Sequence, residues 1–337
     1  MLNLAVRSYC RPFRKPLRTH HGWWEKREGL ILRLQDDQGY VGFGEIAPIP
    51  WFGTETLNAA KTLCAQWPPQ FLPATIAAIP DTLPACQFGF GSALRSLEAA
   101  RDRVPRDSFG QGVSSWTKEP GPWMCALLPA GEAVLDAWLP FYPKGHRTFK
   151  WKIGVAPLPE ELQLFQTLIK VLPADTRLRL DANGGLTPDM AKQWLIACDA
   201  AHNKVEFLEQ PLPPDSSLNW VIETVNTFQT AIALDESVAT IKQLRQVCQH
   251  LQNRVIYVVK PVIAGFPEQL YALCTQYQLD VVFSSALETS IGYRAALHLA
   301  QDLWNAGVPR HALGFGVGHW FQDDWETLTE ADLFYHC

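Results

Sequence analysis

The sequence lacks the cysteine patterns that zinc knuckles and disulfide-rich secreted proteins use. Its eight cysteines are scattered along 337 residues and form no Cys-x-x-Cys pair. Structural zinc sites and small disulfide scaffolds depend on closely spaced cysteines. We therefore expect a cytoplasmic protein, in a reducing compartment, whose fold is held by a hydrophobic core.

Long apolar runs and an excess of positive charge are also missing. No run approaches the roughly 18 apolar residues that a membrane span needs, and the first residues lack the basic start and apolar core of a secretory signal. The net charge is -5, which argues against a general nucleic-acid binder. We expect a small-molecule substrate as the partner, with neither nucleic acid nor membrane, and the choice between monomer and homo-oligomer stays open.

The first third of the chain has the pattern of a small α+β unit. Two apolar segments, 29–34 and 39–44, flank a turn-forming Asp-Asp-Gln-Gly stretch, which is typical of a β-hairpin. Residues 55–67 and 84–102 have helical patterns, and the following stretch is rich in Ser, Gly and Pro. We predict a capping domain over 1–110 and a linker over 111–122.

The second half contains five strand-like segments, each with a charged residue near its C-terminal end. The segments are 148–153, 178–183, 205–211, 232–237 and 255–261, and successive charged residues lie 25 to 29 positions apart. That period suits one strand, one helix and two loops per unit. We predict a (β/α)7β TIM-like barrel over 123–315, from a first strand at 123–128 to an eighth at 311–315. A C-terminal segment, 316–337, would pack back on the capping domain.

The charged residues at these strand ends would meet in one site. The C-terminal ends of barrel strands converge at one mouth, which would bring the carboxylates Asp181, Glu209 and Asp235 together between Lys152 and Lys260. Three oxygen ligands without His or Cys favour Mg2+, with Mn2+ as a substitute. Such a site suits the removal of a proton next to a carboxylate, because a divalent cation stabilises the enediolate that forms.

Single members of this set carry little information. A lone Lys-x-Lys is usually a solvated strand end, and a single Asp at a strand end is usually a turn or helix cap. The argument depends on the recurrence of charged residues on five successive strands at an even pitch.

The motifs resemble those of a known superfamily. Lys150-x-Lys152, Asp181-x-Asn183, Glu209-Gln-Pro, Asp235-Glu-Ser and Lys260-Pro, in this order, look like the signature of the enolase superfamily, in its muconate-lactonizing subgroup. The stretch 42–56 resembles the capping domain of that subgroup. Within the subgroup, the strings 179–183 and 284–292 are most similar to the o-succinylbenzoate synthase family.

The resemblance implies a Mg2+-dependent dehydratase (a lyase). This family forms 2-succinylbenzoate from a succinyl-hydroxycyclohexadiene carboxylate in menaquinone or phylloquinone biosynthesis. Lys152 would remove the proton and return it to the departing hydroxide, and Lys260 would stay cationic over the enediolate. The metal ligands would be Asp181, Glu209 and Asp235. Substrate or supporting groups would be Lys150, Arg179, Asn183, Ser284 and Ser285, whereas strand alternation would point Glu236 away.

Two alternatives remain open at this point. The same lysine pair would serve an isomerase on this scaffold, namely a muconate cycloisomerase, a dipeptide epimerase or an N-acylamino-acid racemase. A barrel that retained its fold only as a binding module is the other alternative. Intact lysines and metal ligands weigh against the binding module.

Overall fold

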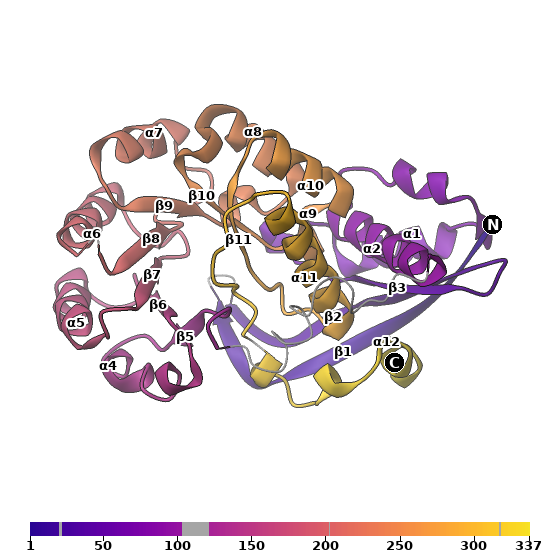
Figure 1. The fold of residues 1–337 in the computed structure, drawn as a ribbon, viewed down its shortest axis with the longest axis horizontal. Coiled ribbons are helices and arrows are strands. Elements are labelled where there is room, and N and C mark those ends of the chain that lie inside the picture. The colour runs from indigo at the N-terminus through magenta and orange to yellow at the C-terminus, as the bar shows by residue number, and fades with distance from the viewer. Residues whose placement is uncertain (20–21, 103–120, 202, 317) are drawn as a thin grey trace.

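The computed structural model describes residues 1–19, 22–102, 121–201, 203–316 and 318–337, which form one antiparallel and one parallel sheet (Figure 1). Among these residues no helix is both long and apolar enough to span a membrane. The predicted linker lies outside the described residues, apart from its last two positions.

The antiparallel sheet belongs to the N-terminal unit and has the strand order β3-β2-β1-β4. Its strands are β1 (Leu2–Thr19), β2 (Gly22–Asp36), β3 (Val41–Ile46) and β4 (Gln70–Phe71). The predicted hairpin is confirmed as the β2–β3 pair. Helices α1 (Leu57–Gln66) and α2 (Pro84–Arg101) complete the unit. Gly44 lets α2 lie directly on β3, because a side chain there would collide with the Gly89 carbonyl oxygen.

The parallel sheet curls into a barrel with helices around it (Figure 1). Its strands follow chain order: β5 (Ala126–Leu128), β6 (Thr148–Lys152), β7 (Arg177–Asp181), β8 (Val205–Glu209), β9 (Ala231–Leu234), β10 (Ile256–Val259) and β11 (Asp280–Phe283). The helices between them are α4 (Val134–Ala137), α5 (Leu158–Val171), α6 (Pro188–Ala200), α7 (Leu218–Thr227), α8 (Ile241–Leu251), α9 (Pro261–Ala264) and α10 (Pro267–Gln276). Helix α11 (Ser290–Asn305) follows β11.

The eighth strand of the barrel is reduced to two single bridges. Leu313 bridges to Met124 and Gly314 bridges to Ser284, which closes the ring between its first and last strands. The Leu313 amide donates to the Trp123 carbonyl at 2.7 Å, and the Gly314 amide donates to the Phe283 carbonyl at 2.8 Å. A continuous strand over 311–315 was predicted, whereas only Leu313 and Gly314 form bridges.

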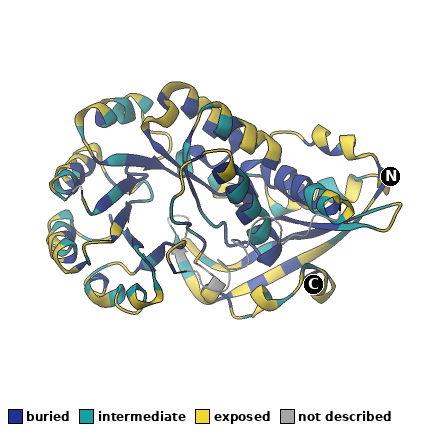
Figure 2. Cartoon of the chain, viewed as in Figure 1, coloured by how far each residue is buried: buried dark blue, intermediate teal, exposed yellow. Residues whose placement is uncertain are grey.

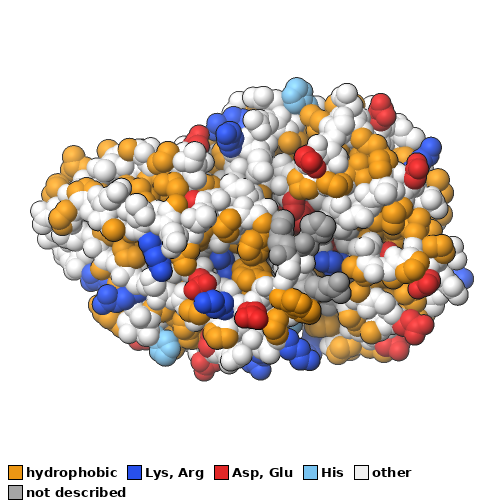
Figure 3. All heavy atoms as spheres, turned by 180° about the vertical axis from the view of Figure 1, so that it is seen from behind, with side chains coloured by type: hydrophobic (Ala, Val, Ile, Leu, Met, Phe, Trp, Pro, Cys, Tyr) orange, Lys and Arg blue, Asp and Glu red, His pale blue; other side chains and the backbone are white. Residues whose placement is uncertain are grey.

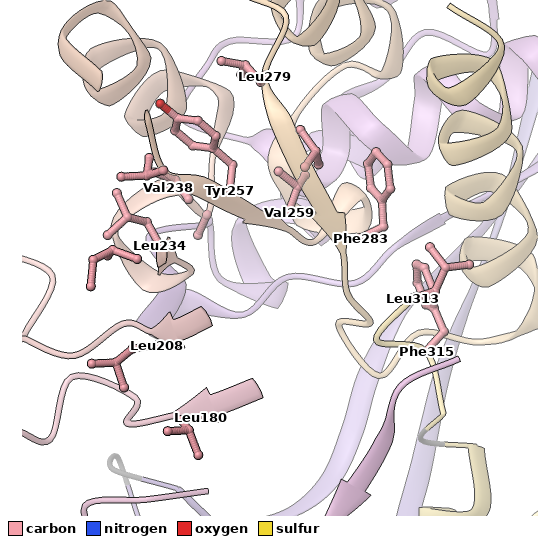
Figure 4. Packing of buried hydrophobic residues seen from close by; sticks show 14 of the residues in the cluster. Leu180, Leu208, Leu234, Val238, Tyr257, Val259, Leu279, Phe283, Leu313 and Phe315 are labelled. Atoms are coloured by element: carbon pink, nitrogen blue, oxygen red, sulfur yellow. The ribbon is translucent and has the colours of Figure 1, made fainter. Parts of the chain in front are cut away.

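The barrel strands are buried on both faces, and alternate residues enter different clusters. Leu180, Leu208 and Leu234 pack with helix residues in the layer between strands and helices, as Figure 4 shows beside Tyr257 and Phe283. A separate cluster inside the ring consists of Phe207, Ala233, Ile256, Val258 and Val282. Figure 2 shows the same division, with buried strands and exposed outer faces on the helices. Because side chains alternate along a strand, Glu209 lies on the inner side with Phe207.

The C-terminal segment returns to the N-terminal unit. Leu333 and Phe334 of α12 (Glu330–His336) pack in a cluster with Tyr9, Ile31 and Phe43. The Phe43 and Phe334 rings lie 5.9 Å apart between centroids. The first and last elements of the chain therefore lie in the same unit, on the opposite side from the outer barrel helices (Figure 1).

Buried Arg11 of β1 forms ion pairs with the C-terminal segment. Its guanidinium donates to Asp323 at 2.6 Å and to Glu326 at 2.8 Å, and it lies 3.7 Å from the centre of the Phe321 ring. The arginine is fully buried, so these partners satisfy a cation that has lost its water.

Candidate active site

A cavity of about 420 Å³ lies at the C-terminal ends of the barrel strands. All ten residues predicted for the site line it: Lys150, Lys152, Arg179, Asp181, Asn183, Glu209, Asp235, Lys260, Ser284 and Ser285. The N-terminal unit contributes an apolar wall of Trp24, Ile49 and Phe52. Figure 3 shows the molecule from behind, where acidic and basic side chains are interspersed among apolar ones.

Two lysines are bonded to the three carboxylates of the cavity. The Lys150 ammonium lies 2.7 Å from Asp181 Oδ2 and 2.8 Å from Glu209 Oε1, and Lys260 is paired with Asp235 Oδ1. Burial alone would lower the pKa of Lys150, but the charges of Asp181, Glu209 and Asp235 raise it well above its usual value. Lys150 therefore keeps its proton and acts as a fixed cation.

The carboxylate cluster carries more negative charge than its lysine contacts neutralise. Burial and then the charge of Asp181 raise the pKa of Glu209 to about 7, although Lys150 acts in the opposite direction. A buried carboxylate such as Glu209, whose ionisation is opposed by burial and by the charges of neighbouring carboxylates, is suited to bind a divalent cation. With the lysines placed as they are, the described residues contain no ready-formed group of three acidic, His or Cys side chains for a metal.

Lys152 differs from both of its lysine neighbours. It lines the cavity at the end of β6 and stands opposite Asp181 in the β6–β7 register. Within the described part of the chain, its ammonium makes no hydrogen bond or ion pair. Of the three lysines in the cavity, Lys152 is the one that no carboxylate binds.

Arg179 is held at the closed end of the barrel. Its guanidinium donates to Glu206 at 2.8 and 3.1 Å and to the Ala312 carbonyl at 2.8 Å. His311 bonds the same Glu206 at 2.9 Å and Asp280 at 2.5 Å. We call Arg179, Glu206, Asp280 and His311 the floor network, because Glu206 and Asp280 lie at the N-terminal ends of their strands. Arg179 lines the cavity, but its guanidinium is already bonded to Glu206 and the Ala312 carbonyl.

Asn183 and Glu236 lie together beside the carboxylates. The Asn183 amide donates to Glu236 Oε1 at 3.2 Å. Burial, followed by the charges of Asp235 and Asp181, raises the pKa of Glu236 to about 8. Glu236 does not line the cavity; it lies in the 3-10 turn that follows β9, which ends at Leu234.

The two serines have different surroundings. Ser285 Oγ lies 3.0 Å from both oxygens of the Glu288 carboxylate, to which it donates, and it accepts the Leu287 amide at 2.9 Å. Burial, together with the charge of Glu45, raises the pKa of Glu288 to about 7. Ser284 is the bridge partner of Gly314 at the seam of the barrel.

Sequence reasoning missed two residues that hold the strand ends in place. Buried Gln210 accepts the Asp235 amide at 3.0 Å and donates to Ser237 Oγ at 2.8 Å, so it links the ends of β8 and β9. Glu161 of α5 accepts the amides of residues 154–156 at 2.8 to 3.0 Å, which fixes the loop after Lys152. The Glu-Gln-Pro string pointed to the first residue, whereas nothing local in the sequence pointed to the second.

Comparisons with known proteins cover nearly the whole chain. Residues 137–332 match the family model described as enolase C-terminal domain-like, and residues 1–97 match the model described as MenC, N-terminal domain. The o-succinylbenzoate synthase of Thermosynechococcus vestitus is 41% identical over 93% of this chain and 92% of that protein. That of Pasteurella multocida is 28% identical over 90% of this chain and 86% of its own length.

Solved structures show the same similarity. The crystal structure of o-succinylbenzoate synthase from Thermosynechococcus elongatus, with magnesium in the active site, has a TM-score of 0.86 and 38% identity and covers 99% of both chains. The substrate-liganded L-Ala-D/L-Glu epimerase of Bacillus subtilis has a TM-score of 0.68 and 22% identity, covering 95% of this chain and 91% of that one. The second comparison shows a shared fold.

Proposed function

We propose that this chain, which belongs to the o-succinylbenzoate synthase family of the enolase superfamily, uses Lys152 as the base of a syn dehydration. The family is one of hydro-lyases in menaquinone biosynthesis. The substrate would be a succinyl-hydroxycyclohexadiene carboxylate and the product 2-succinylbenzoate. The observation that carries the assignment is the difference between Lys152, which no carboxylate binds, and Lys150, which two carboxylates bind.

The physical reason is that a base must give up its own proton before it can accept one. A lysine between two carboxylates keeps its proton, as Lys150 does. Lys152 would take the proton next to the ring carboxylate and return it to the departing hydroxide from the same face. Glu161 holds the loop after Lys152 and so keeps the strand end in place.

The carboxylates Asp181, Glu209 and Asp235 would hold Mg2+, with Mn2+ as a substitute. The bound ion would supply Lewis-acid stabilisation of the negative charge that develops on the substrate carboxylate. Lys260 would contribute a positive charge at the face of the enediolate, and Lys150 would stay a fixed cation between Asp181 and Glu209. Asn183, Ser284 and Ser285 would support the substrate or its neighbours, and Arg179 would act through the floor network.

The direct test is turnover of the cyclohexadiene substrate with Mg2+, followed by the rise of the aromatic product in the ultraviolet spectrum. We expect aromatic product from the wild type, and none above background from Lys152→Ala. Retention of most activity by Lys152→Ala would contradict the assignment of the base.

A racemase on the same scaffold is the second candidate. Lys152 and Lys260 come from separate strands and both line the cavity, an arrangement that also allows one lysine to act on each face of a substrate. Proton exchange at the α-carbon of an N-acylamino acid, without aromatic product from the cyclohexadiene, would favour this candidate.

A further inference from the structure

Lys260 is in contact with an aromatic ring from the other unit of the molecule. Its ammonium lies 4.6 Å from the centre of the Phe52 ring, and on another side it is paired with Asp235. Lys260 follows β10 of the barrel, whereas Phe52 ends the 3-10 turn Pro50–Phe52 of the N-terminal unit. Both residues line the cavity. A cation at this distance from a ring face is attracted by the electrons of that face.

The turn that carries Phe52 is fixed on its N-terminal side by a buried arginine. The Arg27 guanidinium donates to the Pro48 carbonyl at 2.8 Å and also to the Ala47 carbonyl. Its Nε donates to the Ala286 carbonyl at 3.1 Å, in the loop after β11. Arg27 is 1% exposed, so it joins the Phe52 turn to the barrel at a point where water does not compete.

The turn is fixed on its C-terminal side as well. The Ile49 amide donates to Thr54 Oγ1 at 2.8 Å, and the Gly53 amide donates to the Pro50 carbonyl at 2.9 Å. Gly53 has a φ of 88°, a left-handed conformation that favours glycine. The ring of Phe52 is thus presented to Lys260 from a preformed turn.

We infer that Phe52 is a positioning residue that holds the Lys260 ammonium at the mouth of the barrel, an inference that rests on the proposed function. A lysine has a flexible four-carbon stem, so its charge can occupy several places unless it is held. Asp235 holds the ammonium from the barrel side and Phe52 from the side of the N-terminal unit. Without the ring, the charge spends less time where the enediolate forms, and the chemical step slows.

The decisive experiment changes the electrons of the ring while keeping its size. Phe52 is replaced by 4-fluoro-, 3,5-difluoro- and 3,4,5-trifluorophenylalanine, and kcat and KM are measured for the dehydration. We expect log kcat to fall steadily with each fluorine while KM changes less than about twofold. Phe52→Leu should lower kcat by roughly 3- to 30-fold, the range that cation–π contacts span, and Phe52→Tyr should retain most of the activity.

The matched control is Trp51→Leu, which removes a neighbouring ring of the same turn. Trp51 packs edge-on against Trp24 at 4.9 Å and does not line the cavity, so we expect less than a twofold change in kcat. A flat response of kcat to fluorination, with Phe52→Leu no slower than the control, would overturn the inference. Circular dichroism of each variant checks that it has folded.

A second measurement separates this inference from the proposed function. Reductive methylation with 13C-formaldehyde labels lysine ammonium groups without removing their charge, and Lys260→Arg identifies the Lys260 resonance. We expect an upfield ring-current shift of that resonance in the wild type and its loss in Phe52→Leu. A wild type that makes no aromatic product refutes the proposed function, whereas an unshifted Lys260 resonance refutes the contact.

Discussion

Replacing His311 by glutamine should destabilise the protein by an amount that depends on pH. Burial alone would lower the pKa of His311, but its hydrogen bonds to Asp280 and Glu206, and their charges, raise it to about 9. The ordinary value is 6.5. The folded state therefore holds the His311 proton more tightly than the unfolded state does.

The sign and size of the His311 contribution to folding stability follow from this difference in pKa. A raised pKa stabilises the folded state fully below pH 6.5, and the contribution is lost as the pH rises through about 9. A shift of this size corresponds to about 3 kcal/mol, at about 1.4 kcal/mol per pKa unit. Burial alone would raise the pKa of Glu206, but His311 and Arg179 lower it to about 2. That shift describes the same contact from its other side, so the two are not added.

The assay is urea unfolding of wild type and His311→Gln between pH 6 and pH 10. We expect a difference in the free energy of unfolding of about 3 kcal/mol near pH 6 that shrinks steadily toward pH 10. Coincident fluorescence and circular dichroism transitions justify the two-state treatment. His250→Gln, on the exposed end of α8, is the matched control and should cost less than about 0.5 kcal/mol at every pH. A difference that is the same at pH 6 and pH 10 would refute the reasoning.

Three further predictions concern the cavity. Glu209→Gln should weaken Mg2+ binding, measured by calorimetry, by roughly tenfold or more, because a neutral amide is a poorer ligand for a hard cation. Full turnover of the wild type in excess chelator would exclude the metal site. Lys152→Ala should lower kcat by about 10²- to 10⁴-fold, whereas Lys260→Arg should retain measurable activity because it keeps the charge. Equal and complete loss in both variants would instead indicate two-base chemistry. The α-proton of L-Ala-L-Glu should not exchange in deuterated buffer, because residues 313–318 contain no acid to bind the ammonium of the dipeptide. Burying an unpaired charge costs on the order of several kcal/mol. Exchange as fast as dehydration would show that the pocket differs from our description.

The barrel and its site could be predicted from the sequence because their pattern is local and repeated. Each strand end carries its own charged residue, and the even spacing places Asp181, Glu209 and Asp235 at one mouth without knowledge of any long-range contact. The family resemblance added the roles of the two lysines.

The features that could not be predicted depend on contacts between distant segments. The guanidinium of Arg179 is drawn to the floor network by Glu206 and the Ala312 carbonyl, which no spacing rule reveals. The contact of Phe52 with Lys260 joins residues in two different units. Strand alternation could not place Glu236, because β9 ends at Leu234 and Glu236 lies in the 3-10 turn that follows.

The return of the C-terminal segment to the N-terminal unit limits how the molecule can open. The chain crosses between the two units once after α2 and again after the barrel, and the second crossing is secured by Arg11 with Asp323 and by Phe334 with Phe43. Two bodies joined at two separated places cannot swing apart about a single hinge, as they could on one tether. Buried hydrogen bonds of Glu45 with Thr289 and of Arg27 with Ala286 also join the two units. Substrate would therefore enter through movement of the loops at the rim, with both sheets staying in place.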